Sequence, residues 1–166
     1  MKRFLLSGLM ILLGWGLASA QSNEVEMSQN TMKGLRRFYV SVNLEWNKDL
    51  QEHADMTQVD IQKKIEKKLS DAGIDIIKQT TAADVPYLYL HVNMMDAGRG
   101  LVPFAITIGL YQPVKLTLNR DRPAMAVTWD AGNVGIVSYD QMDVIRESAM
   151  GMVAKFLDIY QNVNHR

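Results

Sequence analysis

The chain has 166 residues, with 18 Lys and Arg against 18 Asp and Glu, and it contains no cysteine. A domain of this length can bury enough surface to fold without crosslinks. The lack of cysteine excludes a disulfide framework and thiolate chemistry. The balanced charge argues against a nucleic-acid binder, which needs a basic surface.

The N-terminal segment has the three parts of a secretory signal peptide. Two basic residues precede the apolar run Phe4–Leu17, and the small residues Ala18–Ala20 follow it. The run is too short to span a bilayer, so we expect cleavage after Ala20 and no stable membrane anchor. With no cysteine at the cleavage site and no N-x-[ST] sequon, the expected location is a bacterial periplasm. Secretion beyond the outer membrane is the alternative.

The mature chain begins with a polar stretch that lacks periodicity, residues 21–33. This composition predicts a flexible N-terminal tether, followed by a single domain over residues 34–166. From Leu35 to Trp46, apolar residues alternate with polar ones. Period-two alternation of β-branched and aromatic residues predicts a half-buried strand.

A helix is predicted over residues 58–72. Thr57 is a typical N-cap, Asp60 completes a capping box, and Gly73 stands where a left-handed C-cap belongs. Apolar residues recur between them at helical spacing. A short strand over residues 74–78 is expected directly afterwards.

Three more strands are predicted from the alternation that follows. The first spans Tyr87–Met95 and ends in a hairpin loop at Asp96–Gly100. The second spans Val102–Asn119, where Pro113 predicts a bend, a bulge or an edge position because proline cannot donate to the ladder. The third is centred on Met125–Trp129.

The last predicted element is an amphipathic helix over residues 140–162. A glycine-spaced loop, Gly132–Gly135, is expected to lead into it, with Asp140 as its N-cap. Gly151 lies inside the helix and is expected to let it approach the sheet closely.

The element order is therefore β-α-β-β-β-β-α, which predicts an α+β fold. We expect a two-layer sandwich in which a mixed, mostly antiparallel sheet of four or five strands carries both helices on one face. The first strand–helix–strand unit should be parallel, and the strands from Tyr87 onward should be antiparallel. The pattern does not determine the strand order.

Motifs for catalysis or metal binding are weak. Glu52–Asp55 contains three possible metal ligands, including His53, but consecutive loop residues rarely converge on one ion. The Gly132–Gly135 loop could bind an anion at a helix N-terminus. It lacks a lysine, however, and Asp130 and Asp140 would repel a phosphate. We predict no catalytic residue, no metal, no cofactor and no enzymatic activity.

The second face of the predicted sheet carries aromatic residues flanked by small polar ones. Tyrosine gives a large contact area with few rotatable bonds, so such a face is typical of a recognition surface. The alternative is that the tyrosines only stabilise the sheet through cross-strand pairs. The predicted partner-binding residues are Tyr39, Tyr87, Tyr89, His91, Thr107 and Tyr111.

The C-terminal part of the chain resembles a group of uncharacterised exported bacterial proteins. The resemblance rests on Thr128-Trp129, the glycine loop, and Phe156, Tyr160 and Asn164 at four-residue steps, and it implies no activity. The predicted topology is also similar to the lipopolysaccharide-assembly lipoprotein and to the N-terminal domain of the Tol translocation protein. Those envelope domains serve as adaptors, although this chain lacks the anchoring cysteine of the lipoprotein.

Three hypotheses of function follow. The first is a periplasmic, non-enzymatic adaptor domain that binds another envelope protein through its sheet face or edge. The second is a carrier of a small amphipathic ligand in a cavity between sheet and helices, with the lining residues Met94, Phe104, Met152 and Phe156. The third is an enzyme with a site at His91. The sequence leaves the partner and the oligomeric state open.

Overall fold

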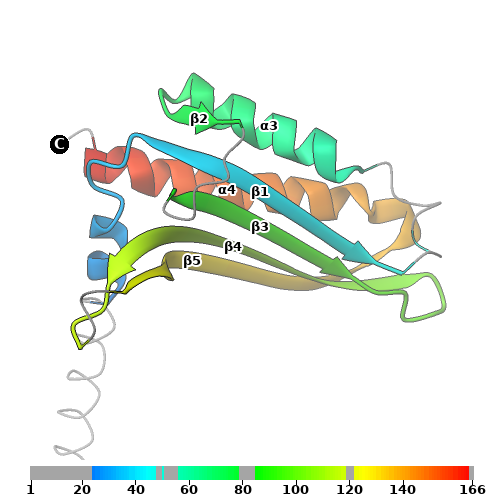
Figure 1. The fold of residues 1–166 in the computed structure, drawn as a ribbon. Coiled ribbons are helices and arrows are strands. Elements are labelled where there is room, and N and C mark those ends of the chain that lie inside the picture. Colours follow the sequence, from blue (N-terminus) through cyan, green and yellow to red (C-terminus); the bar gives the residue numbers. More distant parts are fainter. Residues whose placement is uncertain (1–23, 48–49, 51–55, 79–84, 119–121, 165–166) are drawn as a thin grey trace, which may run out of the picture.

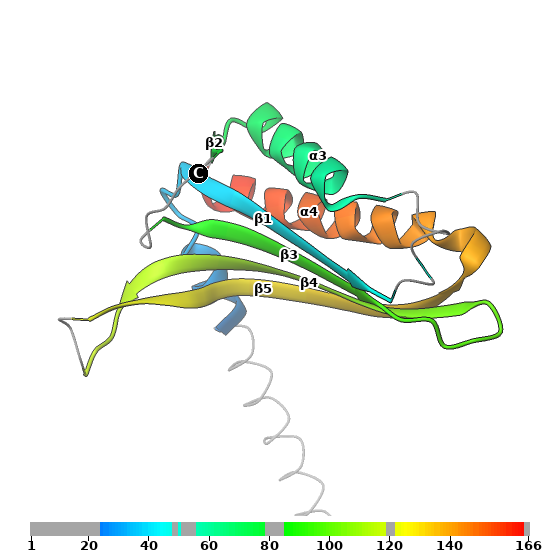
Figure 2. The same ribbon diagram turned by 45° about the vertical axis from the view of Figure 1, so that its right-hand side comes forward.

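A five-stranded mixed sheet carries two helices on one face, as the sequence predicts (Figure 1 and Figure 2). The strands are β1 (Arg37–Trp46), β2 (Asp75–Ile77), β3 (Tyr87–Met94), β4 (Leu101–Lys115) and β5 (Pro123–Ser138). The helices are α3 (Gln58–Asp71) and α4 (Asp143–Asn164), and a 3-10 turn, η1 (Tyr139–Gln141), precedes α4. The computed structural model describes residues 24–47, 50, 56–78, 85–118 and 122–164.

Two predicted features lie outside the described residues. These are the signal peptide, residues 1–20, and the possible ligand cluster Glu52–Asp55. Within the part of the chain that is described, no helix is long and apolar enough to cross a membrane.

The strand order is β2-β1-β3-β4-β5. β1 runs parallel to both of its neighbours, β2 and β3, whereas β3, β4 and β5 are antiparallel to one another. Both predicted strand directions are therefore confirmed. This order makes β5 an outermost strand along one side of the sheet.

The local signals around α3 are also confirmed. The backbone N–H of Asp60 donates to Thr57 Oγ1 at 3.1 Å, which satisfies one of the unpaired donors of the first turn. Gly73 has a φ of 82°, the left-handed conformation that ends helices and that glycine adopts without strain. Between the two caps, Ile61, Ile65 and Leu69 face the core.

The predicted loop at Gly132–Gly135 is wrong, because β5 continues through it. Residues 132–135 pair with residues 104–107 of β4 in unbroken register. Gly135 stands opposite Phe104, and a Cβ atom there would lie 2.6 Å from Phe104 Cζ. Gly135 therefore makes room for an aromatic ring and does not mark a turn. Asp140 is likewise not an N-cap, since it lies within η1.

Pro113 lies where β4 has only one neighbour. β4 pairs with β3 as far as Tyr111, and beyond that point it pairs only with β5. The missing N–H of the proline therefore removes no ladder bond on the side of β3. A register shift between the partners of Leu110 and Tyr111 leaves Thr128 as an extra residue, so the bulge lies on β5 and not at Pro113.

The core fills the space between the sheet and the helices. Phe156 of α4 lies at its centre, with ring centroids 5.9 Å from Phe38 and 5.3 Å from Trp129. The four residues expected to line a ligand cavity all belong to this packed cluster: Met94, Phe104, Met152 and Phe156.

The N-terminal segment is not a simple tether. Residues 24–30 are helical, and Met32 is fully buried. The hydroxyl of Tyr160 donates to the carbonyl of Leu35 at 2.6 Å. Asn164 donates to the carbonyl of Met32 at 3.1 Å and accepts from the N–H of Gly34 at 2.7 Å. Side chains of α4 thus hold the segment, and a single buried methionine leaves no periodic signal in the sequence.

Candidate functional site: the open tyrosine face

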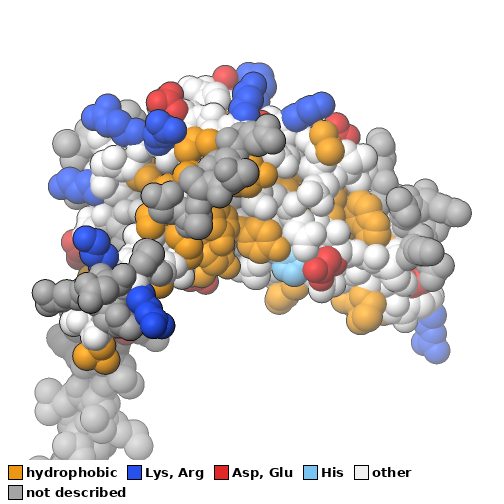
Figure 3. Space-filling view, in the orientation of Figure 1, with side chains coloured by type: hydrophobic (Ala, Val, Ile, Leu, Met, Phe, Trp, Pro, Cys, Tyr) orange, Lys and Arg blue, Asp and Glu red, His pale blue; other side chains and the backbone are white. Residues whose placement is uncertain are grey.

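The sheet face opposite the helices carries every residue predicted to bind a partner. The strand registers place Tyr39, Tyr87 and Tyr111 in one row across β1, β3 and β4. Hydrophobic side chains gather over these strands in the space-filling view (Figure 3). We define the tyrosine face as Tyr39, Ser41, Tyr87, Tyr89, His91, Thr107, Gly109 and Tyr111.

The aromatic rings on this face pack against one another. Tyr87 and Tyr111 are stacked, with centroids 4.6 Å apart and planes 5° apart. Tyr89 meets Tyr111 edge-on at 6.2 Å and lies 6.0 Å from the imidazole of His91. These contacts fix the rings before any ligand arrives, so little side-chain entropy would be lost on binding.

The tyrosine hydroxyls can act as hydrogen-bond donors. Burial raises the pKa of Tyr87 above its ordinary value of 10.0, and the neighbouring Tyr111 and Tyr89 raise it further. The Tyr87 hydroxyl therefore stays protonated at neutral pH. A ligand on this face would meet both apolar rings and polar hydroxyl tips.

Two open depressions lie on the face. One has a volume of about 360 Å³ and is lined by Tyr39, Ser41, Tyr87, Tyr89 and Tyr111. The other has a volume of about 480 Å³ and is lined by Tyr89, His91, Thr107, Ile108, Gly109, Tyr111, Val127 and Asp130. Tyr89 and Tyr111 line both, so the two depressions are neighbours on one surface.

Gly109 is a lining residue of the second depression and is itself buried. It stands opposite Tyr89 in the ladder. A Cβ atom at this position would lie 3.3 Å from Tyr111 Cε2 and 3.6 Å from Val127 Cγ1. The glycine therefore lets the ring of Tyr111 approach the backbone closely. The alternating pattern did not single out Gly109, although a glycine inside an alternating strand is a recognised signal of close approach.

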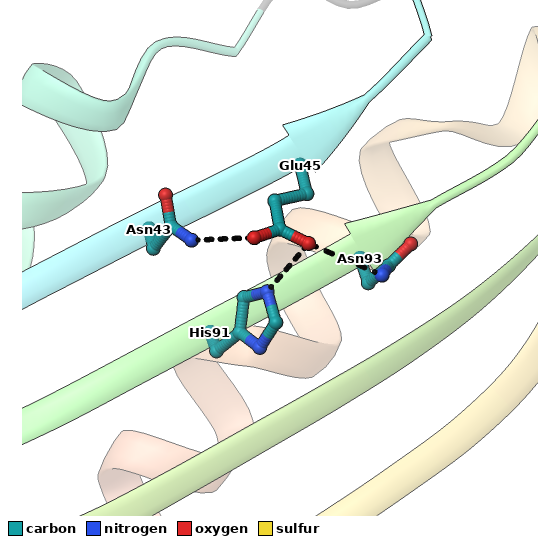
Figure 4. Close-up of polar contacts among 4 residues, drawn as sticks. All are labelled: Asn43, Glu45, His91 and Asn93. Carbon is teal, nitrogen blue, oxygen red and sulfur yellow. Dashed lines mark hydrogen bonds and ion pairs between the residues drawn. The ribbon is translucent and has the colours of Figure 1, made fainter.

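A polar cluster lies at one end of the tyrosine face (Figure 4). Glu45 Oε1 accepts a 3.0 Å hydrogen bond from Asn43, and Oε2 accepts one of 3.4 Å from Asn93. His91 Nε2 lies 3.3 Å from Glu45 Oε2, but the contact is not aligned as a hydrogen bond. Among the described residues, Nε2 has no hydrogen-bond partner.

The face as a whole can offer rings, hydroxyl groups and a few carboxylates. Across the described residues that line its two depressions there is one carboxylate, Asp130, and no lysine or arginine. In the same part of the chain, no three His, Asp or Glu side chains gather as metal ligands would. The lining therefore suits apolar or basic groups of a ligand, because Asp130 and the ring faces attract cations.

No protein-family model matches the sequence, and no curated protein matches it. Solved structures give partial similarities. A PelC dodecamer from Paraburkholderia phytofirmans is 16% identical, covers 78% of this chain and 90% of its own, and has a TM-score of 0.44. The hypothetical protein CT253 from Chlamydia trachomatis is 6% identical, with 78% and 99% coverage and a TM-score of 0.43.

A minor lipoprotein from Acinetobacter baumannii is 13% identical, with 72% and 92% coverage and a TM-score of 0.31. At these scores, none of the similarities carries an argument about function.

Proposed function

We propose that this protein is a non-enzymatic adaptor domain of the bacterial cell envelope. It is exported to the periplasm and binds another envelope protein through the tyrosine face. The predicted signal peptide supports the location, and the open face supports the binding role. Aromatic surfaces that stay uncovered beside polar groups are typical of protein interaction sites.

The observation that carries the proposal is the pair of adjoining depressions on the tyrosine face, both of which are lined by Tyr89 and Tyr111. Gly109 lets the ring of Tyr111 lie close to the backbone, and this ring borders the second depression together with Tyr89. A hollow bordered by fixed rings can receive a side chain of a partner, which is how interface hot spots are built.

The side chains that line the second depression also indicate which kind of partner segment would bind there. Tyrosine rings, hydroxyl groups and the single carboxylate of Asp130 border the hollow. An apolar or aromatic side chain would bury its surface there, and an arginine would gain from both the rings and the carboxylate. We therefore expect the partner to present an apolar or arginine-containing segment.

Binding is tested by capture from an envelope extract of the source bacterium. The tagged chain 21–166 serves as bait, and the captured polypeptides are identified by mass spectrometry. Thr107 is exposed on the face, so Thr107→Arg should block the hollow without removing a packed ring. Val59→Arg is the matched control, because Val59 is 58% exposed on α3. We expect Thr107→Arg to reduce capture by about tenfold or more and Val59→Arg to leave it unchanged.

A second variant replaces Tyr87, Tyr89 and Tyr111 with alanine and is interpreted only if its circular dichroism spectrum is unchanged. Full capture by folded Thr107→Arg and by the folded triple variant would show that the tyrosine face is not the binding surface. Export is tested separately by fractionating cells that express residues 1–166. The proposal expects a periplasmic product that begins at Gln21, and an uncleaved cytoplasmic chain would contradict it.

A further inference from the structure

The outer edge of β5 is long and open. β5 spans 16 residues and is the last strand in the sheet order, so it pairs with β4 along one edge only. Residues 132–136 are all exposed, with Val134 at 78% and Ile136 at 60%. The opposite margin of the sheet is β2, which has three residues. The two edges of the sheet thus differ greatly in how much backbone they present.

The direction of the backbone groups on β5 follows from the ladder. The N–H of Tyr139 donates to the carbonyl of Gly100 at 3.1 Å. In an antiparallel pair, hydrogen-bonded positions recur at every second residue. The odd-numbered residues 129–137 therefore bond to β4, and the even-numbered residues 130–138 point their N–H and C=O groups outward. We call these outward groups the free edge of β5.

Among the residues that the structure describes, nothing gives the free edge the usual protection against pairing. Natural edge strands carry lysine, proline, bulges or a covering element that prevent another strand from adding. Between Trp129 and Ser138, the sequence has neither proline nor lysine, and Asp130 is its only ionisable residue. The register shift in β5 lies before this stretch, so the stretch itself is regular. An edge of this kind favours the addition of another strand.

We propose that the free edge of β5 pairs with the same edge of a second copy of this chain, about a two-fold axis at Val134. The two copies then form one continuous sheet. With an axis at this residue, the outward N–H and C=O groups of the even-numbered residues in one copy face those of the other copy, as an antiparallel ladder requires. The proposal does not rest on the function proposed for the tyrosine face, although Asp130 takes part in both.

The register is selected by side-chain complementarity. An axis at Val134 sets Asp130 opposite Ser138, whose hydroxyl donates to Gln141 Oε1 at 3.1 Å in the single chain and would turn to the carboxylate in the pair. It sets Ile136 opposite Gly132, so that a large side chain covers a position that has none. Two other registers are worse: an axis at residue 133 buries Asp130 against Ile136, and an axis at residue 130 sets two carboxylates against each other.

The pairing also determines where the two tyrosine faces lie. Two identical strands that pair antiparallel in one sheet are related by a two-fold axis perpendicular to the sheet. That operation keeps each face on its own side. Both tyrosine faces therefore lie on the same side of the joined sheet, and all helices lie on the other side. The assembled pair would present a bivalent surface.

The experiment measures mass and register together on the chain 21–166. Sedimentation should give twice the monomer mass, with dissociation on dilution. Val134→Lys places two ammonium groups opposite each other at the axis and should yield a folded monomer. Thr107→Lys is the matched control on the same face, one strand inward, and it should remain a dimer.

The register is tested by disulfide formation, since the native chain has no cysteine. Val134→Cys should crosslink under mild oxidation, because residues at the axis are within disulfide reach. Ile136→Cys should not crosslink, because its two copies would lie about 13 Å apart along the strands. A monomer at every concentration would overturn the proposal, as would a dimer in which Val134→Cys fails to crosslink or Ile136→Cys crosslinks equally well. If the chain forms the dimer but captures no partner, the pairing of β5 stands and only the function proposed for the tyrosine face is contradicted.

Discussion

Phe104 and Gly135 stand opposite each other on β4 and β5, and a Cβ atom at position 135 would lie 2.6 Å from Phe104 Cζ. The ring therefore occupies the place where a side chain would begin. We predict that Gly135→Ala lowers the free energy of unfolding by about 1–3 kcal/mol, the usual effect of overpacking a filled site. Urea denaturation measures this change.

Gly151→Ala should have the opposite effect. Gly151 lies in α4, and a methyl group at this position would meet no atom of another element within 4 Å. The glycine therefore does not mark a close approach of the helix to the sheet, as the sequence suggested. Alanine in a helix interior is favoured over glycine by about 0.5–1 kcal/mol. We expect urea denaturation to show that Gly151→Ala raises the free energy of unfolding by this amount. A lower free energy of unfolding would mean that a methyl group at position 151 meets a neighbouring atom.

The stacked pair Tyr87 and Tyr111 should contribute a measurable coupling energy. Aromatic pairs in such geometry contribute about 0.5–1.5 kcal/mol beyond the area that they bury. A double-mutant cycle with Tyr87→Leu and Tyr111→Leu, followed by denaturant unfolding, isolates this energy. A coupling near zero would mean that the rings do not stabilise each other, and the face would then be fixed by the strands alone.

Tyr160 should make stability depend on pH in the alkaline range. Burial raises the pKa of its hydroxyl above 10.0, while Arg36 lowers it and Asp75 raises it to smaller extents. The folded chain then holds the proton more tightly than the unfolded chain. The contribution is complete below pH 10 and is lost as the pH rises through the raised value.

Tyr160→Phe removes this hydroxyl and its 2.6 Å hydrogen bond to the carbonyl of Leu35. We expect the free energy of unfolding at neutral pH to fall by about 1 kcal/mol. The decline above pH 10 should become shallower than in the native chain. Urea titrations at pH 8 and at pH 11 give the free energy of unfolding of both proteins at each pH. If both proteins lose the same amount of stability between the two pH values, the assignment to Tyr160 is contradicted.

Asn164 should control the order of the N-terminal segment. Its amide oxygen accepts from Gly34, and its amide nitrogen donates to the carbonyls of Met32 and Tyr160. We predict that Asn164→Ala increases the hydrogen exchange rate of the Gly34 amide by about tenfold or more, because its partner is lost. Exchange at Leu90, in the central strand β3, serves as the internal control.

The sequence predicted the fold well wherever the signal is local. Alternation in residues 87–94 indicated both a strand and the side to which each residue points, so Tyr87, Tyr89 and His91 were placed on one face correctly. The caps at Thr57 and Gly73 are single-residue signals with a fixed geometry, and they delimited α3. Such features need no information from the rest of the chain.

Features that depend on distant contacts were missed. The glycines at 132 and 135 suggest a turn until Gly135 is seen opposite Phe104. The order of Met32–Leu35 depends on side chains of α4, and the strand order depends on the parallel pairing of β1 with β3. The role of Gly109 similarly depends on a residue of the same strand and one of its neighbour, because the ring of Tyr111 and the side chain of Val127 lie over it.

The hydrogen bond between Gly34 and Asn164 joins positions 130 residues apart. It closes the domain into a loop that includes nearly all of its sequence. Such a contact cannot form until the final turn of α4 has been synthesised, and parallel pairing of β1 with β3 is also non-local. Contacts of this kind slow folding, because the entropy of closing a long loop is lost before they form.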